Sequence, residues 1–295
     1  MRAEGRSEPS RIAFSTLAFP DATLAAALSA GRRWGYSGVE LRLIDGELID
    51  PAMPAERRAQ IRRTLAAAGL PVIAVDSSIR LTGDEPGPDL RRFLQLASDW
   101  DAPLVRVFGG DLDPPPARQD RLRAAARVLE QAVPLAAGLG VAIGVETHDA
   151  FSASSAVAEL LALLSADGVP SDLVGAVWDS HHPHRMGETP AEVYANLGSR
   201  LLLAQVKDAR RAPDGDWRLV LLGGGEVPVR EMLGLLTAGG YPHWISVEWE
   251  KRWHPEIEDP EVALPQHQAL LTVWQESDLG RQGRQSAASG SSAPG

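Results

Sequence analysis

Cysteine is absent from the 295-residue chain, which excludes disulfide bonds, a thiolate nucleophile and metal sites held by cysteine. Basic charge is also scarce: the formal net charge at pH 7 is −10, whereas a duplex-DNA binder normally presents a basic face. No apolar run approaches the roughly 20 residues that span a bilayer, and the first residues contain no signal-peptide-like stretch. We therefore expect a cytoplasmic protein with no nucleic-acid or membrane partner.

Short apolar, β-branched runs recur along the chain between stretches of helical period. The eight runs are RIAFSTL, SGVELRL, PVIAVDSS, LVRVFGG, VAIGVETH, LVGAVWDS, LLLAQVKD and WISVEWE. The stretches between them are rich in Ala, Leu and Arg, and one more follows the last run. Continuous apolar strands that alternate with helices indicate a parallel sheet covered by helices.

The eight units predict an α/β fold, a single (β/α)8 or TIM barrel, which typically takes about 250 residues. A doubly wound open sheet is the alternative, but no run has the character of an edge strand. We expect one domain over 10–276, a disordered N-terminus over 1–9 and a disordered Gly/Ser/Ala-rich tail over 277–295. Asp21 and Ser152 are expected to begin helices, and Gly69 and Gly140 to end them.

Polar residues follow the apolar runs at the points where the strands should end. In a TIM barrel the active site lies at the C-terminal ends of the strands, and side chains two residues apart share a face. Such pairs end four consecutive runs, and earlier runs add further polar residues: Glu146 with His148, Asp179 with His181, Gln205 with Lys207, Glu248 with Glu250, Glu40 with Arg42, and Arg106. The pattern predicts one polar site at the barrel mouth.

Three carboxylates in this set, Glu146, Asp179 and Glu248, would repel one another if they converged at the mouth. A nearby positive charge or raised pKa values must offset the repulsion. A divalent cation is the simplest solution, and oxygen-rich ligands suit Mg2+ and Mn2+. For any single residue a structural role is the alternative, such as an ion pair between Glu146 and Arg106.

The strand ends ETH, WDSHH, QVKD and SVEWE, in this order, resemble the xylose isomerase-like superfamily of sugar phosphate isomerases and epimerases. SGVELR, LGGGEVPV and EWEKRWHPEIEDPE resemble it too, so the resemblance covers about residues 11–275. The superfamily contains ketose 3-epimerases, hydroxypyruvate isomerases, inosose dehydratases and a divergent abasic-site endonuclease. The motifs are specific for the superfamily and not for a substrate.

The resemblance implies roles for individual residues. Glu146 and Glu248 would be metal ligands that also exchange a substrate proton from opposite faces of the sugar, and Asp179 would be a third ligand. Gln205 stands where the family usually has a histidine ligand, and an amide oxygen can serve a hard cation. The resemblance thus implies one divalent ion as cofactor, with Mn2+ or Mg2+ favoured over Co2+ or Zn2+. The expected metal ligands are Glu146, Asp179, Gln205 and Glu248, and the expected catalytic residues are Glu146, Glu248, His182 and Lys207.

Substrate contacts are assigned to the remaining polar residues: Glu40, Arg42, Arg106, His148, His184, Glu250 and Trp253. Arg42 and Arg106 either grip an acidic substrate or form ion pairs inside the barrel. His148 either supports a neighbouring ligand or contacts substrate. The alternative for His184 is a place in a histidine-rich surface loop, and the alternative for Trp253 is a structural packing role. The LLGGGEVP stretch, residues 221–228, is either a phosphate-binding loop or a plain turn.

The resemblance implies a divalent-metal-dependent isomerase or epimerase of a small sugar, polyol or hydroxy-keto compound, with proton transfer through an enediolate. An inosose-type dehydratase on the same site is the first alternative. A non-catalytic metabolite-binding barrel is the second, and only Gln205 favours it. An abasic-site endonuclease is disfavoured by the acidic charge and the seven histidines. Superfamily members are often dimers or tetramers, so a homo-oligomer is expected.

Overall fold

The computed structural model describes the backbone of residues 11–289 and the side chains of residues 11–277. Eight parallel strands close into a barrel in the order β1-β12-β9-β8-β7-β6-β5-β2, which confirms the predicted (β/α)8 fold. The strands are β1 (Ile12–Ser15), β2 (Gly38–Leu41), β5 (Val72–Arg80), β6 (Leu104–Phe108), β7 (Ala142–Glu146), β8 (Val174–Asp179), β9 (Leu201–Val206) and β12 (Trp244–Val247). Closure leaves the barrel without an edge strand, because β1 pairs with both β12 and β2.

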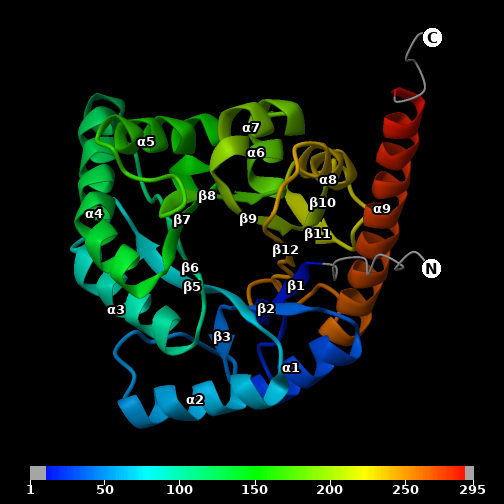
Figure 1. Ribbon diagram of the computed structural model, residues 1–295, viewed down its shortest axis with the longest axis horizontal. Coiled ribbons are helices and arrows are strands. Elements are labelled where there is room, and N and C mark those ends of the chain that lie inside the picture. The colour runs from blue at the N-terminus through cyan, green and yellow to red at the C-terminus, as the bar shows by residue number, and fades with distance from the viewer. Residues whose placement is uncertain (1–10, 290–295) are drawn as a thin grey trace, which may run out of the picture.

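Helices ring the barrel, and the long helix α9 runs along its side (Figure 1). They are α1 (Leu24–Arg33), α2 (Ala55–Ala68), α3 (Pro86–Asp99), α4 (Arg118–Leu139), α5 (Ser154–Ala166), α6 (His181–Arg185), α7 (Pro190–Leu197), α8 (Val229–Ala238) and α9 (Pro260–Ser289). In α3 the buried residues Leu90, Phe93, Leu94 and Ala97 form one helical stripe. Stripes of this kind pack on the outward strand faces and make most of the core.

The observed ends of the helices agree only in part with the ends expected from the sequence. Gly69 and Gly140 end α2 and α4 in the left-handed conformation, with φ of 67° and 66°, as predicted. The two expected helix starts are wrong. The Thr23 side chain caps α1 because Asp21 lies too early, in a turn. The Ser152 hydroxyl donates to a backbone carbonyl at 2.9 Å and does not cap α5.

The last helix extends further than the expected end of the barrel domain. α9 continues to Ser289, beyond the boundary drawn at residue 276. The Ala-, Gln- and Arg-rich stretch there offers little to bury, yet these residues have good helix propensity. The disorder expected for residues 1–9 and 290–295 falls outside the described residues. Every helix within residues 11–289 lacks the length and apolar character that a membrane crossing requires.

Two short antiparallel hairpins extend the connections after β2 and β9. β3 (Leu43–Ile44) pairs with β4 (Glu47–Leu48), and β10 (Asp208–Arg211) pairs with β11 (Trp217–Val220). Neither hairpin was expected from the sequence. The second one brings Trp217 against the rings of His181 and His184, at centroid distances of 5.3 and 5.4 Å.

The barrel interior has an apolar floor beneath a polar layer. Ile73, Leu104, Val177 and Leu203 pack together at the floor. Two positions further along three of these strands lie Arg106, Asp179 and Gln205. Because side chains alternate between faces, the strands that supply the floor also point these polar groups inward, nearer the C-terminal end.

Candidate active site at the barrel mouth

Six carboxyl groups and three cations meet at the C-terminal end of the barrel. The carboxyl groups are Glu40, Asp76, Glu146, Asp179, Glu248 and Glu250, and the cations are Arg42, Arg106 and Lys207. All of them except Glu250 are buried. The polar strand ends thus form one cluster with an excess of acidic groups, as the sequence predicted.

Asp179, at the end of β8, has one oxygen engaged and one turned toward the cluster. Its Oδ1 accepts hydrogen bonds from the backbone N–H groups of His181 and His182, at 2.9 and 3.0 Å. Its Oδ2 accepts no hydrogen bond and lies 3.2 Å from the Nζ of Lys207. Carboxylate oxygens of Glu146, Asp179 and Glu248 lie within 4.8 Å of one another. Three oxygens at this spacing can share one cation.

Gln205 completes an oxygen set with these three residues. It lies opposite Asp179 in the β8–β9 register, and its Nε2 donates to Glu40 Oε1 at 2.8 Å. The carbonyl Oε1 of Gln205 is therefore turned away from Glu40, and it is buried without a hydrogen-bond partner among the residues that the structure describes. Buried polar atoms are seldom left in this state, so this oxygen is available to a cation.

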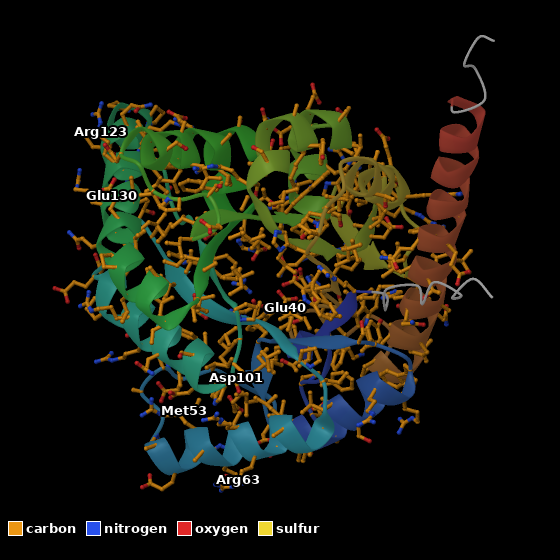
Figure 2. All side chains as sticks on the ribbon, viewed as in Figure 1. Glu40, Met53, Arg63, Asp101, Arg123 and Glu130 are labelled. Atoms are coloured by element: carbon orange, nitrogen blue, oxygen red, sulfur yellow. The ribbon has the colours of Figure 1, made fainter. Side chains whose placement is uncertain are left out.

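Glu40 lies inside the barrel beneath the mouth, far from exposed side chains such as Arg63 and Arg123 (Figure 2). It is fully buried, and it accepts hydrogen bonds from Gln205 and from the Ser246 hydroxyl, the latter at 2.6 Å. Its own partners enclose the Glu40 side chain, and the substrate contact expected for it stays a prediction. Its position supports a different role, which is to orient Gln205.

Burial and mutual repulsion act on the acids of the cluster. Burial raises the pKa of Glu40 well above its ordinary value, and the Asp76 and Glu248 carboxylates raise it further. Burial also raises the pKa of Glu146; Arg106 opposes this effect, while Glu248 and Asp179 add to it. Both effects favour protonation of these buried acids, and a further cation would compete with protons for the same oxygens.

Lys207 provides one positive charge within the cluster. Its Nζ forms ion pairs with Asp179, Glu248 and Glu250. Burial tends to lower the pKa of Lys207, but the Asp179, Glu248 and Glu250 carboxylates outweigh burial and raise it well above its ordinary value. Lys207 is therefore a fixed ammonium group that holds Glu248.

Arg106 is fully engaged within the barrel. Its Nε lies 3.0 Å from Glu146 Oε2 as an ion pair, although the N–H does not point well enough at that oxygen to form a hydrogen bond. Its Nη2 lies 3.3 Å from Asp76 Oδ2, and its Nη1 donates to the Ser77 carbonyl at 2.9 Å. The guanidinium carbon also lies 4.2 Å from the centre of the Phe108 ring. Of the two readings left open for Arg106, these contacts favour internal ion pairing.

Two histidines border the cluster. His182 is buried with no hydrogen-bond partner at either ring nitrogen, and burial together with Lys207 lowers the pKa of its imidazole well below the ordinary value. His182 is therefore neutral. The His148 ring lies 4.6 Å from that of His182 and 4.4 Å from Phe108, and its Nδ1 lies 2.9 Å from Asp149 Oδ1. The contact with Asp149 occupies Nδ1, so Nε2 is the ring nitrogen of His148 that is left for another partner.

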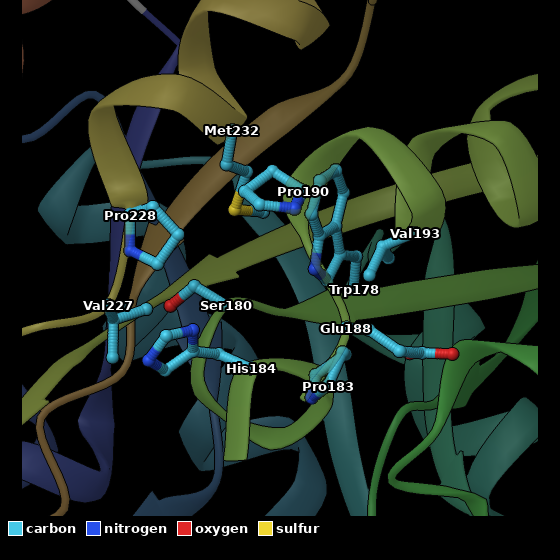
Figure 3. A pocket seen from close by; sticks show the side chains of 10 residues that line it. All are labelled: Trp178, Ser180, Pro183, His184, Glu188, Pro190, Val193, Val227, Pro228 and Met232. Carbon is cyan, nitrogen blue, oxygen red and sulfur yellow. The ribbon is translucent and has the colours of Figure 1, made fainter. Parts of the chain in front are cut away.

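His184 lies outside the barrel, contrary to the expected substrate contact. It borders a separate small cavity together with Trp178, Pro190 and Met232 (Figure 3). The reason is the helix α6, which begins at His181. Helical spacing turns a residue two positions after His182 to another side, whereas a strand would have kept both on one face.

Some site residues were missed in the sequence. Asp76 ends the apolar run VIAVD, the same pattern as the runs that end in Glu146 and Asp179, so the signal was present. Phe108 and Leu17 line the mouth cavity beside Trp253, and nothing distinguished them from core residues. Trp253 itself is 48% exposed at the rim, as a substrate-facing aromatic would be.

Asp208 explains the glycine-rich turn that follows β11. Its carboxylate accepts hydrogen bonds from the backbone N–H groups of Ala209, Gly223, Gly225 and Val227, at distances of 2.8 to 3.1 Å. A Cβ on Gly225 would lie 2.1 Å from Asp208 Oδ1, so this close approach requires glycine. These N–H groups already have an anion, which favours the plain-turn reading over a phosphate loop.

Comparisons with known proteins point to one family. The family model described as "Xylose isomerase-like TIM barrel" matches residues 28–272. A search of curated proteins found no match.

Similar solved structures include an L-ribulose 3-epimerase, with 16% identity over 97% of this chain and 100% of that chain and a TM-score of 0.75. The IOLI protein with a bound zinc atom has 15% identity over 90% of this chain and 97% of that chain, with a TM-score of 0.74. The probable 3-DHS dehydratase AsbF from Bacillus anthracis has 17% identity over 89% of this chain and 98% of that chain, with a TM-score of 0.69. Identities this low show a shared fold only.

Proposed function

The chain belongs to the xylose isomerase-like TIM-barrel family, and from this premise we propose that it is a metal-dependent isomerase or epimerase of a small hydroxy-carbonyl compound. One observation carries the proposal. The orphaned carbonyl oxygen of Gln205 is buried next to the strand that supplies Asp179, and Asp179 groups with Glu146 and Glu248. A purely structural cluster would have no use for an unpartnered buried oxygen at this place.

The residues present fit a hard divalent cation. Glu146, Asp179, Gln205 and Glu248 would hold it, and all four offer oxygen. An all-oxygen set favours Mn2+ or Mg2+, whereas a histidine at position 205 would have favoured later metals. When bound, the ion would polarise the substrate carbonyl and stabilise the negative charge of an enediolate.

Glu146 and Glu248 are suited to move the proton. Glu146 ends β7 and Glu248 follows β12, and β8 and β9 lie between these strands, so the two carboxylates reach the cavity from different sides. One carboxylate removes the proton next to the carbonyl. Return of a proton to the opposite face gives epimerisation, and return to the neighbouring carbon gives isomerisation. General acid–base help of this kind contributes about 10²–10⁴ in rate.

Neighbouring side chains hold these groups in place. Arg106 pairs with Glu146, and Lys207 pairs with Glu248, so each carboxylate is oriented by a buried cation. Neutral His182 can exchange a hydrogen bond with a substrate hydroxyl at the wall of the site, and Trp253 offers an aromatic face at the rim. These contacts would position a polyhydroxy substrate over the two glutamates.

A dehydratase is the second candidate, because Lys207 and Glu248 place an acid beside a base. Removal of a hydroxyl and of a proton from adjacent carbons needs such a pair. The strong retention of the Lys207 proton makes it a weak acid, which favours the isomerase or epimerase. The two reactions differ in product: dehydration forms a carbon–carbon double bond and releases water.

Metal analysis and solvent-deuterium exchange test the proposal together. Protein prepared with Mn2+ should hold about one ion per chain, and NMR should show deuterium entering one ketose, inosose or hydroxy-keto acid of a panel. Glu248→Gln should slow this exchange by about 10²–10⁴. Glu258→Gln alters an exposed glutamate on the following loop and should leave the exchange unchanged. A chain that binds no Mn2+ and exchanges no proton would be a binding protein instead.

A further inference from the structure

Arg42 differs from the other cations of the mouth in having no acidic partner. Arg106 and Lys207 each contact two or more carboxylates. No ion pair joins Arg42 to a carboxylate among the residues that the structure describes, although Glu146 and Glu248 are near enough to influence its pKa. A buried guanidinium group is normally paired, so Arg42 is the exception in this cluster.

The Arg42 side chain is held firmly, and part of its hydrogen-bonding capacity is unused. Its Nη1 donates to the Ser78 hydroxyl at 3.0 Å and to the Asp76 carbonyl at 3.4 Å. Its backbone N–H donates to the Thr16 hydroxyl at 2.8 Å. The described residues provide no partner for Nε and Nη2, and the side chain lines the mouth cavity with Lys207 and Trp253.

Burial without a partner has an electrostatic consequence. Burial, with a smaller effect of Arg106, lowers the pKa of Arg42 to about 10. The group remains charged at neutral pH, and the Asp76, Glu248 and Glu146 carboxylates, which raise its pKa, offset burial only in part and form no ion pair with it. An anion that reached the cavity would supply the missing partner, and two N–H groups on one edge of a guanidinium match the two oxygens of a carboxylate.

We propose that Arg42 binds a carboxylate group of the substrate, so that the substrate is a hydroxy-keto acid rather than a neutral sugar. This inference rests on the proposed function. The acidic groups of the cluster outnumber its cations and would repel an anion. The carboxylate is therefore expected to bind after a divalent ion has offset part of this excess. A phosphate ester can use the same guanidinium edge, so the experiment includes one to distinguish the two anions.

Matched ligand pairs can test the inference without a measurement of turnover. Fructuronate and fructose differ in one terminal group, a carboxylate in place of CH2OH, which lies away from the hydroxy-ketone end. Hydroxypyruvate and dihydroxyacetone form a shorter pair of the same kind, and fructose 6-phosphate tests a phosphate ester. Binding of each ligand to the Mn2+-loaded protein is measured by isothermal titration, after the metal content and the thermal unfolding of every variant are recorded.

The expected result is a preference of about tenfold or more for the acid within at least one pair. Arg42→Gln should reduce this ratio to about one. Arg42→Lys should retain part of it, because lysine keeps the positive charge but lacks the two N–H groups on one edge. The matched control is Arg252→Gln, an exposed arginine beside Trp253, which should preserve the full ratio.

Three results would overturn the inference. The first is a folded, Mn2+-loaded Arg42→Gln or Arg42→Lys protein that keeps the full preference. The second is a wild-type protein that takes up Mn2+ and prefers the neutral member of both pairs. The third is tighter binding of the phosphate ester than of either acid. A wild-type chain that takes up no Mn2+ would instead overturn the proposed function at its first step.

Discussion

Gln205 donates its side-chain amide to Glu40 at 2.8 Å, and this bond decides which atom of Gln205 faces the cluster. Glu40 is itself held by the Ser246 hydroxyl on its other oxygen, so the amide of Gln205 has a fixed acceptor. The side-chain nitrogen of Gln205 is thus turned toward Glu40, and its oxygen is left for the ion that we propose.

Substitution of Gln205 should change metal preference in a defined direction. In Gln205→His an imidazole nitrogen replaces the amide oxygen, and the affinity for Zn2+ should rise relative to Mn2+ by about tenfold or more. In Gln205→Leu the fourth oxygen is lost, and Mn2+ affinity should fall by about 10–100-fold. Competition with a chelator of known affinity measures both. Equal Zn2+/Mn2+ ratios in wild type and Gln205→His would show that residue 205 is not a ligand.

Removal of the Lys207 ammonium group should destabilise the metal-free protein. Lys207→Met leaves Asp179 and Glu248 buried without their shared cation, and breaking a buried pair in this way costs about 3–5 kcal/mol. Mn2+ should then stabilise the variant more than it stabilises the wild type. Denaturant unfolding with and without Mn2+ measures the difference. Arg92→Met breaks a half-exposed pair with Asp89 and should cost much less; an equal loss in both variants would contradict the argument.

Asp208 should contribute to stability through the turn it holds. Asp208→Asn replaces a charged acceptor of four backbone N–H groups, and we expect a loss of about 2–4 kcal/mol in the free energy of unfolding. Hydrogen exchange should speed up at Gly223 and Gly225, which donate to this carboxylate. The control is Asp214→Asn, whose ion pair with Arg218 is half exposed and should contribute little. Unchanged exchange at the two glycines would refute the assignment.

His267 should make stability depend on pH. Burial against Trp249 lowers the pKa of His267 from 6.5 to about 4. Between these values the unfolded chain takes up a proton that the folded chain does not, so this contribution is complete above pH 6.5 and is lost as the pH falls toward 4. The slope approaches about 1.4 kcal/mol per pH unit. Unfolding at pH 7, 6 and 5 should show a flatter dependence in His267→Phe; parallel curves would contradict the prediction.

The polar residues at the strand ends could be predicted from the sequence because strands and helices have different, simple side-chain periods. Apolar runs ending in Glu146, Asp179 and Glu248 place polar groups at one end of a parallel barrel, wherever the strands lie relative to one another. The same rule failed at His184, where a helix replaces the strand spacing. It did not reveal how Glu40 is enclosed, because the periodicity shows which way a residue points and not how deeply it is buried.

The roles of the two arginines could not be separated in the sequence. Arg42 and Arg106 both follow apolar strand residues, and each was equally suited to an ion pair or to a substrate. The difference lies in contacts between distant strands: Asp76 of β5 offers a carboxylate oxygen to Arg106 and only its backbone carbonyl to Arg42. Such pairings depend on strand register, and a single sequence carries no record of it.

The order of the strands around the barrel separates the proposed ion ligands from the proposed partner of the substrate carboxylate. Glu146, Asp179 and Gln205 lie at or near the ends of β7, β8 and β9, and Glu248 follows β12, whereas Arg42 follows β2. Because Glu40 and Arg106 hold Gln205 and Glu146, a change of specificity has to leave these two residues in place. A designer seeking a new specificity would begin with the loops after β2 and β6, and could exchange them as one cassette.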